Sequence, residues 1–153
     1  MDFWQVLKNR HCVRKFSSEE VAEEDIEKLL AAAKMGPTAG NMQDWRFQVV
    51  KNKETKKKLA AAALEQNFIA QAPVVLVISS DLKVAQRHYA ERGLELYSIQ
   101  DVAIAAEHIF LAAIEMGLAT CWVGAFTEEE VKEILDLPAQ ERPMVIMPVG
   151  YEK

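Results

Sequence analysis

The sequence predicts an α+β domain in which a sheet of about four or five strands is covered by helices. Val74–Ile78 is a continuous apolar run, mostly β-branched, that is too short for an average helix. Tyr97–Met116 has apolar residues at helical spacing over a long segment, and the other predicted elements are intermixed along the chain. Because 153 residues can form one hydrophobic core and half of them are apolar, we expect a single domain spanning residues 1–153.

Two helices and a basic segment are predicted at the start of the chain. Asp2–Asn9 has apolar side chains at helical spacing, and Glu23–Met35 begins with acidic residues that favour a helix N-terminus. The second helix is expected to end at Gly36-Pro37, a combination that stops helices. The stretch Asn9–Phe16 between the two helices is irregular and basic.

The middle of the chain predicts a loop, two strands and a helix. Pro37–Asp44 is the loop, and Arg46–Lys51 alternates apolar and polar residues as a strand does. Lys53–Ala63 is rich in lysine and alanine and is predicted to be helical. We expect Val74–Ile78 to be a central strand buried on both faces.

The last third predicts the core helix and the remaining elements. Tyr97–Met116 is expected to be the core helix, followed by a strand at Leu118–Val123. Thr127–Leu135 begins with glutamates in a pattern similar to a capping box and predicts another helix. Met144–Gly150 is the last predicted strand, and Pro148 within it predicts an edge or a bend.

Charge and composition exclude several classes of protein. The formal net charge of −5 argues against a general nucleic-acid or anionic-membrane binder, because such proteins carry a broad basic face. No signal peptide is recognisable, and no apolar run reaches the roughly 18 residues needed to cross a bilayer. Histidines and cysteines are scattered, so we expect no metal site and no disulfide between Cys12 and Cys121. The expected location is the cytoplasm.

Three segments carry residues suited to ligand binding, and each also has an ordinary structural interpretation. Arg10–Lys15 can direct several charged donors at one phosphate, although a short basic run is more often a solvated turn. Gly36–Trp45 has small residues that let a planar ligand approach closely, or it is only a loop after a helix. Gly117–Phe126 can present backbone amides, or it is a buried strand followed by a turn.

Taken together, in order and spacing, these segments resemble the flavin-dependent nitroreductase family. Arg10–Phe16 is similar to the family's opening Arg-Arg/His-Ser-Val-Arg-x-Phe, and Pro37–Trp45 is similar to Pro-Ser-Ala-x-Asn-x-Gln-Pro-Trp. Ala72–Val77 is similar to Ala-Pro-Val-Val-Leu-Val, and Gly117–Gly124 to Gly-Leu-x-x-Cys-Trp-Val-Gly. The resemblance covers nearly the whole chain.

The resemblance implies a fold, a cofactor and a reaction. It implies a three-layer nitroreductase-like fold with a mostly antiparallel sheet, assembled as a homodimer with FMN at the subunit interface. NADH or NADPH would reduce the flavin, and a small oxidised acceptor such as a nitroaromatic or a quinone would then take the electrons in a ping-pong cycle. Because the flavin performs the chemistry, no catalytic side chain is expected.

The resemblance also implies roles for particular residues. Arg10 and His11 would contact the FMN phosphate and ribityl chain with Cys12 nearby, and Arg14 would approach the pyrimidine edge of the ring. The residues expected to cover the ring from the other subunit are Pro37, Thr38, Ala39 and Asn41. Further contacts are expected from Gln43 and Asn67 at the ring edges and from Trp122, Val123 and Gly124 beside the ring.

Three departures from the family pattern affect these expectations. Cys12 replaces a serine and is a poorer hydrogen-bond partner, and Asp44 replaces the proline before Trp45. The sequence stops at Gly150–Lys153, before the basic segment that usually helps to hold the FMN phosphate. We therefore expect a short family member that retains FMN weakly.

Some alternatives stay open at the level of the sequence. A noncatalytic FMN-binding module and a flavin-free structural homodimer are both compatible with the motifs. The polar stretch Arg87–Tyr97 is either a lid over the site or an exposed helix. The physiological acceptor and the choice between NADH and NADPH are not determined.

Overall fold

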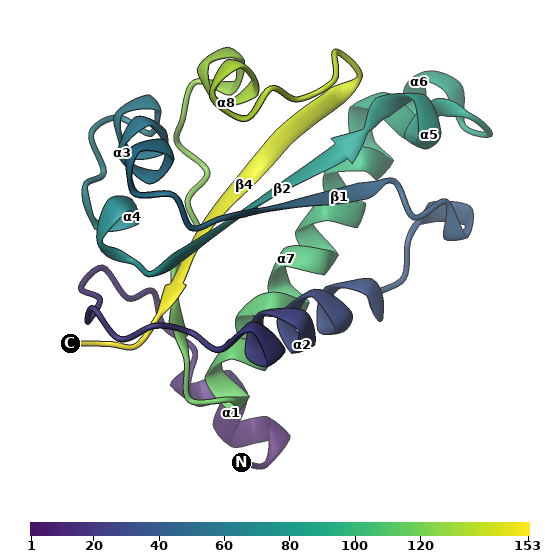
Figure 1. Cartoon of the computed structure of the whole chain (residues 1–153). Coiled ribbons are helices and arrows are strands. Elements are labelled where there is room, and N and C mark those ends of the chain that lie inside the picture. The colour runs from purple at the N-terminus through teal and green to yellow at the C-terminus, as the bar shows by residue number, and fades with distance from the viewer.

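A four-stranded antiparallel sheet forms the middle layer of the protein, which a computed structural model describes from Met1 to Lys153 (Figure 1). The strands lie in the order β1 (Trp45–Val50), β2 (Val74–Asp81), β4 (Glu141–Gly150) and β3 (Ala119–Thr120). All three neighbouring pairs are antiparallel. The expected α+β class and the mostly antiparallel sheet are confirmed.

Helices α2 (Glu23–Lys34) and α7 (Ser98–Glu115) cover one face of the sheet (Figure 1). Alternate residues of a strand point to the same face, so Val74, Leu76 and Ile78 of β2 join this layer. They form one apolar cluster with residues of the two helices that include Leu29, Ile109 and Phe110. The predicted core helix is thus confirmed.

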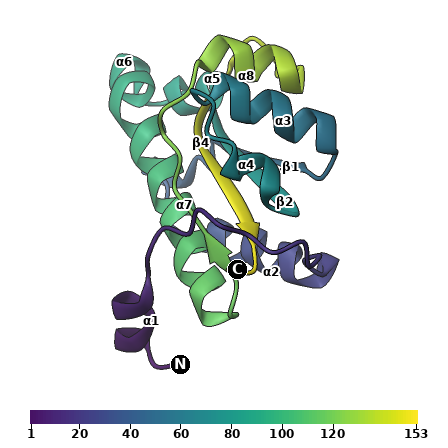
Figure 2. The ribbon, with the colours of Figure 1, turned by 90° about the vertical axis from the view of Figure 1, so that its left-hand side faces the viewer.

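Helices α3 (Lys53–Ala62), α4 (Phe68–Gln71) and α8 (Glu128–Leu135) cover the opposite face (Figures 1 and 2). Val75 and Val77 of β2 belong to the second apolar cluster, together with Leu59 of α3 and Val131 of α8. Residues Val74–Ser80 are all buried. The prediction of a central strand buried on both faces is confirmed.

Helix α1 (Phe3–Asn9) projects from the body of the protein beside the C-terminal end of α7 (Figure 2). Asp2 caps this helix by accepting a hydrogen bond from the Gln5 backbone N–H. Val6 is buried, whereas Phe3 and Trp4 are 62% and 70% exposed. The helix therefore presents two large apolar side chains to its surroundings.

The connection from β2 to α7 consists of short helical turns. These are α5 (Leu82–Gln86), α6 (Ala90–Arg92) and the π-helical turn η2 (Gly93–Tyr97). The continuous helical stretch Ala90–Glu115 is long and apolar enough, by length and composition alone, to cross a membrane. Half of its most apolar window is buried within the protein, and α7 packs on β2 and β4 as a core helix does.

Three local predictions need correction. The strand expected at Leu118–Val123 is reduced to Ala119–Thr120 and one isolated bridge from Val123 to Ile146. Thr127 makes no side-chain capping bond at the start of α8. Pro148 lies in β4, an inner strand, and not at an edge.

The interruption of β3 explains why Pro148 is tolerated in an inner strand. Ile146 exchanges both backbone hydrogen bonds with Val123, so Pro148, two residues further on, faces the same neighbouring segment. The next pairing on that side is Thr120 with Val149. Pro148 therefore falls in the gap between these pairings, where no partner requires its missing N–H.

Candidate functional site

The basic segment after α1 is fixed along the C-terminal end of the sheet. Its backbone is extended, with Val13 donating to the Thr120 carbonyl at 3.0 Å and Phe16 bridging to Glu152. Val13 and Phe16 are buried in a small apolar cluster. Arg10 and Arg14, on the same segment, are exposed.

Both arginines lie against aromatic rings. The guanidinium carbon of Arg10 is 5.1 Å from the Phe110 ring centroid, and that of Arg14 is 5.9 Å from the Phe68 centroid. Neither guanidinium forms an ion pair with a carboxylate. Their N–H groups are therefore positioned by the rings and available to an anionic ligand.

His11 adds a third basic group to this face. Its Nδ1 lies 2.8 Å from the Asn9 carbonyl oxygen and its Nε2 lies 3.4 Å from Glu152. The Asn9 hydrogen bond, and then the nearby Glu152 carboxylate, raise the pKa of His11 above its ordinary value. This shift favours the cationic imidazolium at neutral pH.

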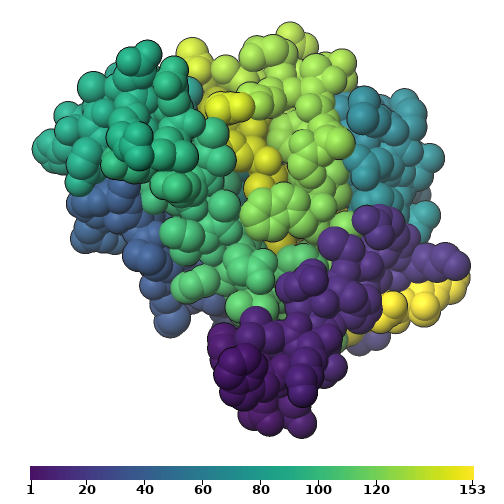
Figure 3. Space-filling model, turned by 180° about the vertical axis from the view of Figure 1, so that it is seen from behind, coloured from purple at the N-terminus to yellow at the C-terminus, as the bar shows by residue number.

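Segments distant in sequence complete the same face. Asn67 is exposed at the start of α4, beside the Phe68 ring that carries Arg14. Gln66 donates to the Ala125 carbonyl at 3.1 Å and so holds the start of α4 near the segment after β3. In Figure 3 the basic segment, in purple, lies side by side with α7 and the light-green segment that follows it.

The segment Trp122–Gly124 is half-buried at Trp122, buried at Val123 and exposed at Gly124. A Cβ built on Gly124 would meet only the Trp122 indole nitrogen, at 3.7 Å, so the backbone there is open to a ligand. The buried Thr120 hydroxyl has no protein hydrogen-bond partner.

The two cysteines meet in this structure, which the sequence did not reveal. Cys12 and Cys121 are free thiols that both pack in the second apolar cluster, where Cys121 Sγ donates to the Trp122 carbonyl at 3.8 Å. Burial, followed by the contact with Cys12, raises the pKa of the Cys121 thiol to about 12. Cys121 is thus a neutral, structural thiol.

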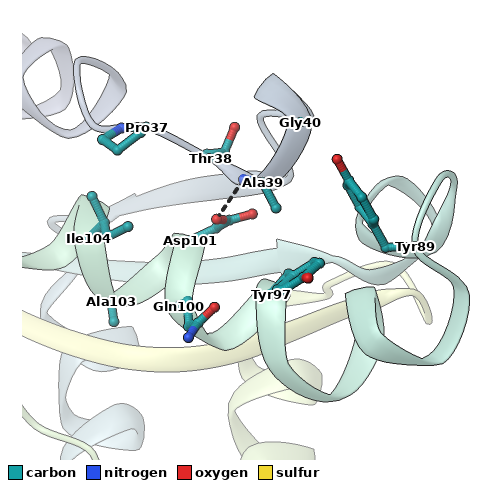
Figure 4. Close-up of a pocket in the computed structure, with 10 residues that line it drawn as sticks. All are labelled: Pro37, Thr38, Ala39, Gly40, Tyr89, Tyr97, Gln100, Asp101, Ala103 and Ile104. Carbon is teal, nitrogen blue, oxygen red and sulfur yellow. Dashed lines mark hydrogen bonds between the residues drawn. The ribbon is translucent and has the colours of Figure 1, made fainter.

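The predicted contacts in the loop after α2 lie elsewhere. Thr38 begins the turn η1 (Ala39–Asn41), and its hydroxyl accepts from the Gln43 N–H at 3.0 Å. Gln43 also donates through its side-chain amide to Asn41 at 3.3 Å. The loop forms one wall of a surface cavity of about 730 Å³, lined by Pro37, Thr38, Ala39, Gly40, Tyr89, Tyr97, Gln100, Asp101, Ala103 and Ile104 (Figure 4).

Asp101 joins this loop to α7 and was not anticipated from the sequence. Its Oδ1 accepts the Ala39 backbone N–H at 2.9 Å (Figure 4). Tyr89 and Tyr97 face the loop across the cavity, so the Arg87–Tyr97 stretch supplies part of its wall. Helical spacing alone could not single out Asp101, because an acidic residue near a helix start is common.

The predicted contacts therefore form two separate groups on one chain. The first group comprises Arg10, His11, Cys12, Arg14, Asn67, Trp122, Val123 and Gly124, and the second comprises Pro37, Thr38, Ala39, Asn41 and Gln43. Arg10 packs on Phe110 of α7, whereas Ala39 is bound to Asp101, nine residues earlier on that helix. At 1.5 Å per residue, these two anchor points are about 13.5 Å apart along the helix axis.

The three-layer fold belongs to a known structural class. A nitroreductase family protein from Clostridium novyi matches it with a TM-score of 0.91 and 27% identity, over 100% of this chain and 86% of that chain. An FMN-dependent nitroreductase from Clostridium difficile matches it with a TM-score of 0.84 and 28% identity, over 97% and 86% of the two chains.

The sequence comparisons give the family. The model of the nitroreductase family matches residues 7–71 and 63–151. A relative from Archaeoglobus fulgidus, provisionally named NADH dehydrogenase/NAD(P)H nitroreductase, is 31% identical over 153 residues, covering 97% of this chain and 84% of its own. The chain belongs to the nitroreductase family, as the order of its motifs predicted.

Proposed function

We propose that this protein is an FMN-dependent oxidoreductase that transfers electrons from NAD(P)H to a small oxidised acceptor, such as a nitroaromatic or a quinone. The observation that carries the proposal is the placement of Arg10 and Arg14, two unpaired guanidinium groups, on the same face as the open backbone at Gly124. Similarity to the FMN-dependent enzyme and to the relative named for NAD(P)H supports the choice of cofactor and donor. When bound, FMN would take a hydride from NAD(P)H and pass two electrons to the acceptor.

The residues of the first group have the chemistry that FMN needs. Arg10 and His11 supply cationic donors for the phosphate, and Arg14 supplies a cation for the pyrimidine edge of the ring. Asn67 is exposed and can hydrogen-bond a ring edge. Cys12 contributes little to the phosphate, because its side chain is half-buried against the apolar clusters.

We further infer that the active form is a homodimer in which Trp122, Val123 and Gly124 of one subunit and the second group of the other subunit enclose the ring. A twofold axis can bring unlike patches of two identical chains together, which the separation along α7 prevents within one chain. Such an interface would bury exposed apolar side chains, among them Phe3, Trp4 and Ile99. We place this activity in the cytoplasm, where NADH and NADPH are available.

The experiment is a cofactor titration followed by a reduction assay. The purified protein is mixed with FMN, its melting temperature is measured, and NADH or NADPH is added without oxygen while the flavin absorbance is followed. We expect FMN to raise the melting temperature, one nicotinamide to bleach the flavin, and a quinone to restore the colour over many turnovers.

The other outcomes identify the competing functions. Binding without bleaching by either nicotinamide would indicate a noncatalytic FMN module. An unchanged melting temperature at saturating FMN would indicate a structural protein without a flavin. The variant Arg10→Gln/Arg14→Gln is the control, because it removes the two cations that the proposal depends on while leaving the buried Val13 and Phe16 in place.

A further inference from the structure

Two hollows in the surface, of about 880 and 310 Å³, meet at Ser18 and Gln71, which line both of them. Together they form a groove beside the C-terminal residues, and its walls contain five lysines but only one carboxylate side chain, that of Glu20. The five lysines of this lysine groove are Lys15, Lys51, Lys53, Lys56 and Lys153. Positive charge is thus concentrated here in a protein whose formal net charge is −5.

One end of the lysine groove contains two lysines on neighbouring extended segments. Lys153 donates its backbone N–H to the Lys15 carbonyl at 3.1 Å, and Ser17 donates to the Tyr151 carbonyl at 2.9 Å. This antiparallel register sets Lys15 opposite Lys153, with both side chains on the same face and their Cβ atoms about 5 Å apart. Like charges directly opposite each other destabilise the pairing of the two segments.

The other end of the lysine groove contains two lysines at the start of α3. Lys53 is the first residue of that helix, where the helix dipole disfavours a cation. Lys56 is only 8% exposed, and its Nζ donates to the carbonyl oxygens of Ala72 and Pro73 at 2.6 and 3.2 Å. Burial lowers the pKa of Lys56 and the charge of Lys53 lowers it further, whereas Glu20 opposes both effects.

Most carboxylates of the adjoining segments are bound to other cations. Glu23 is paired with Lys51, Glu54 with Lys57 at 3.1 Å, and Glu152 lies 3.4 Å from His11. The other four lysines of the groove form no ion pair. The fold therefore holds two pairs of cations in unfavourable positions with a single carboxylate, Glu20, between the segments that carry them.

We propose that the lysine groove binds a small molecule through a diphosphate group, with one phosphate at Lys15 and Lys153 and the other at Lys53 and Lys56. An anion at each end would relieve the repulsion within each pair, and lysine is a common ligand of phosphate. Ser18 lines both hollows, and its hydroxyl can donate to an oxygen between the two phosphates.

This site is distinct from the one proposed for FMN. Arg10 and Arg14, the guanidinium groups assigned to the flavin, line neither hollow. Gln71 lies on α4 together with Phe68, which carries Arg14, so the two sites are neighbours on that helix. Binding in the lysine groove requires no flavin and does not rest on the proposed oxidoreductase function.

The test is calorimetric titration of the full chain with pyrophosphate, without FMN or divalent metal and at fixed ionic strength. Lys15→Gln/Lys153→Gln removes the cations of one end, and Lys53→Gln removes the exposed cation of the other end. We expect each to raise the Kd for pyrophosphate about tenfold to a hundredfold, the loss expected for a charge-assisted hydrogen bond. Pyrophosphate should also raise the melting temperature of the parent, and raise that of each variant much less.

Two control variants separate the lysine groove from other sources of affinity. Lys34→Gln/Lys58→Gln removes two exposed lysines that line no cavity, and it should leave the Kd within about twofold although the net charge changes equally. Arg10→Gln/Arg14→Gln should also leave the Kd for pyrophosphate nearly unchanged.

Three outcomes would overturn the proposal. The first is a parent protein that does not bind pyrophosphate. The second is an equal loss of affinity in Lys15→Gln/Lys153→Gln and Lys34→Gln/Lys58→Gln, which would mean that only net charge attracts the anion. The third is a loss confined to Arg10→Gln/Arg14→Gln, which would place pyrophosphate at the proposed FMN site. A protein that binds pyrophosphate through the lysines but is not reduced by NAD(P)H would support this site and refute the proposed function alone.

Discussion

The guanidinium carbon of Arg10 lies 5.1 Å from the centre of the Phe110 ring, which fixes the basic segment against the core helix. Phe110 is 2% exposed, so the ring itself cannot move without disturbing the apolar cluster around it. The arginine is thereby held in place while its N–H groups stay free for a ligand. The contribution of each basic residue to binding of the FMN phosphate can therefore be tested by single substitutions.

Replacing Arg10 by glutamine is expected to weaken FMN binding selectively. A charge-assisted hydrogen bond contributes about 1.5–3 kcal/mol, so the Kd for FMN should rise about tenfold to a hundredfold. Riboflavin lacks the phosphate, and its Kd should change little. Titration of flavin fluorescence measures both, with Lys58→Gln on the exposed surface of α3 as the charge-matched control. Equal effects on FMN and riboflavin would show that Arg10 does not hold the phosphate.

The contribution of His11 to FMN binding is expected to disappear as pH rises. Its hydrogen bond to Asn9 and the Glu152 carboxylate raise its pKa above 6.5, so the cation is present below that raised value and is lost above it. The ratio of the Kd of His11→Asn to that of the parent should exceed one near pH 6 and fall toward one as pH rises through the raised pKa. His88→Asn, at another exposed histidine, should show a ratio near one throughout. A ratio for His11→Asn that does not vary with pH would contradict the role of the imidazolium.

The same raised pKa predicts a small effect on stability. The folded protein binds the His11 proton more tightly than the unfolded chain, so this group stabilises the fold below about pH 6.5 and loses that effect as pH rises through the folded pKa. The side chain is exposed, so solvent screening keeps the contribution small. Urea unfolding of the parent and His11→Asn at several pH values measures it.

Mixed dimers test whether the two groups of residues belong to one shared site. Arg10→Gln/Arg14→Gln damages the first group. Gly40→Val damages the second, because the backbone φ is +55° and a Cβ would meet the Tyr89 hydroxyl at 2.6 Å. Each variant alone should be inactive.

Co-refolding the two variants should restore about a quarter of the parent activity, because half of the dimers are mixed and each of these has one intact site. The oligomeric state is followed by sedimentation, and native mass spectrometry, which separates the two variants by mass, shows whether mixed dimers form. Exchange without recovered activity would mean that each chain builds its site alone.

Two substitutions in the connection to α7 are expected to have opposite effects on stability. Gly93 has an ordinary helical φ of −61°, where alanine normally stabilises a helix by about 1 kcal/mol. A Cβ there would lie 2.1 Å from the Ala85 carbonyl oxygen, so Gly93→Ala should instead lower the free energy of unfolding by about 1–3 kcal/mol. Ala90 has a φ of +48°, a conformation that glycine adopts more readily than alanine. Ala90→Gly should therefore raise the free energy of unfolding by up to about 1 kcal/mol. Urea denaturation gives both values, and a stabilising Gly93→Ala would contradict the packing of α5 on η2.

The helices and the central strand could be read from local patterns because burial repeats with the period of each element. Val74–Ile78 is apolar throughout because both faces of β2 are covered, and α7 shows a broad apolar stripe because it packs on the sheet. Local sequence patterns gave wrong predictions where the pairing between strands determined the structure. The place of Pro148 in an inner strand depends on where β3 stops, which no local signal encodes.

The sequence alone determined the family, the fold class and the residue types offered to a ligand, because these follow from motif order and periodicity along the chain. Only the tertiary structure decided which of those residues stand together. It assembled Arg14, Asn67 and Gly124 on one face and kept the Pro37–Gln43 loop at the other end of α7. It also brought the Ala39 N–H to Asp101, a hydrogen bond across 62 positions of the chain that forms only when the loop after α2 and helix α7 pack in three dimensions.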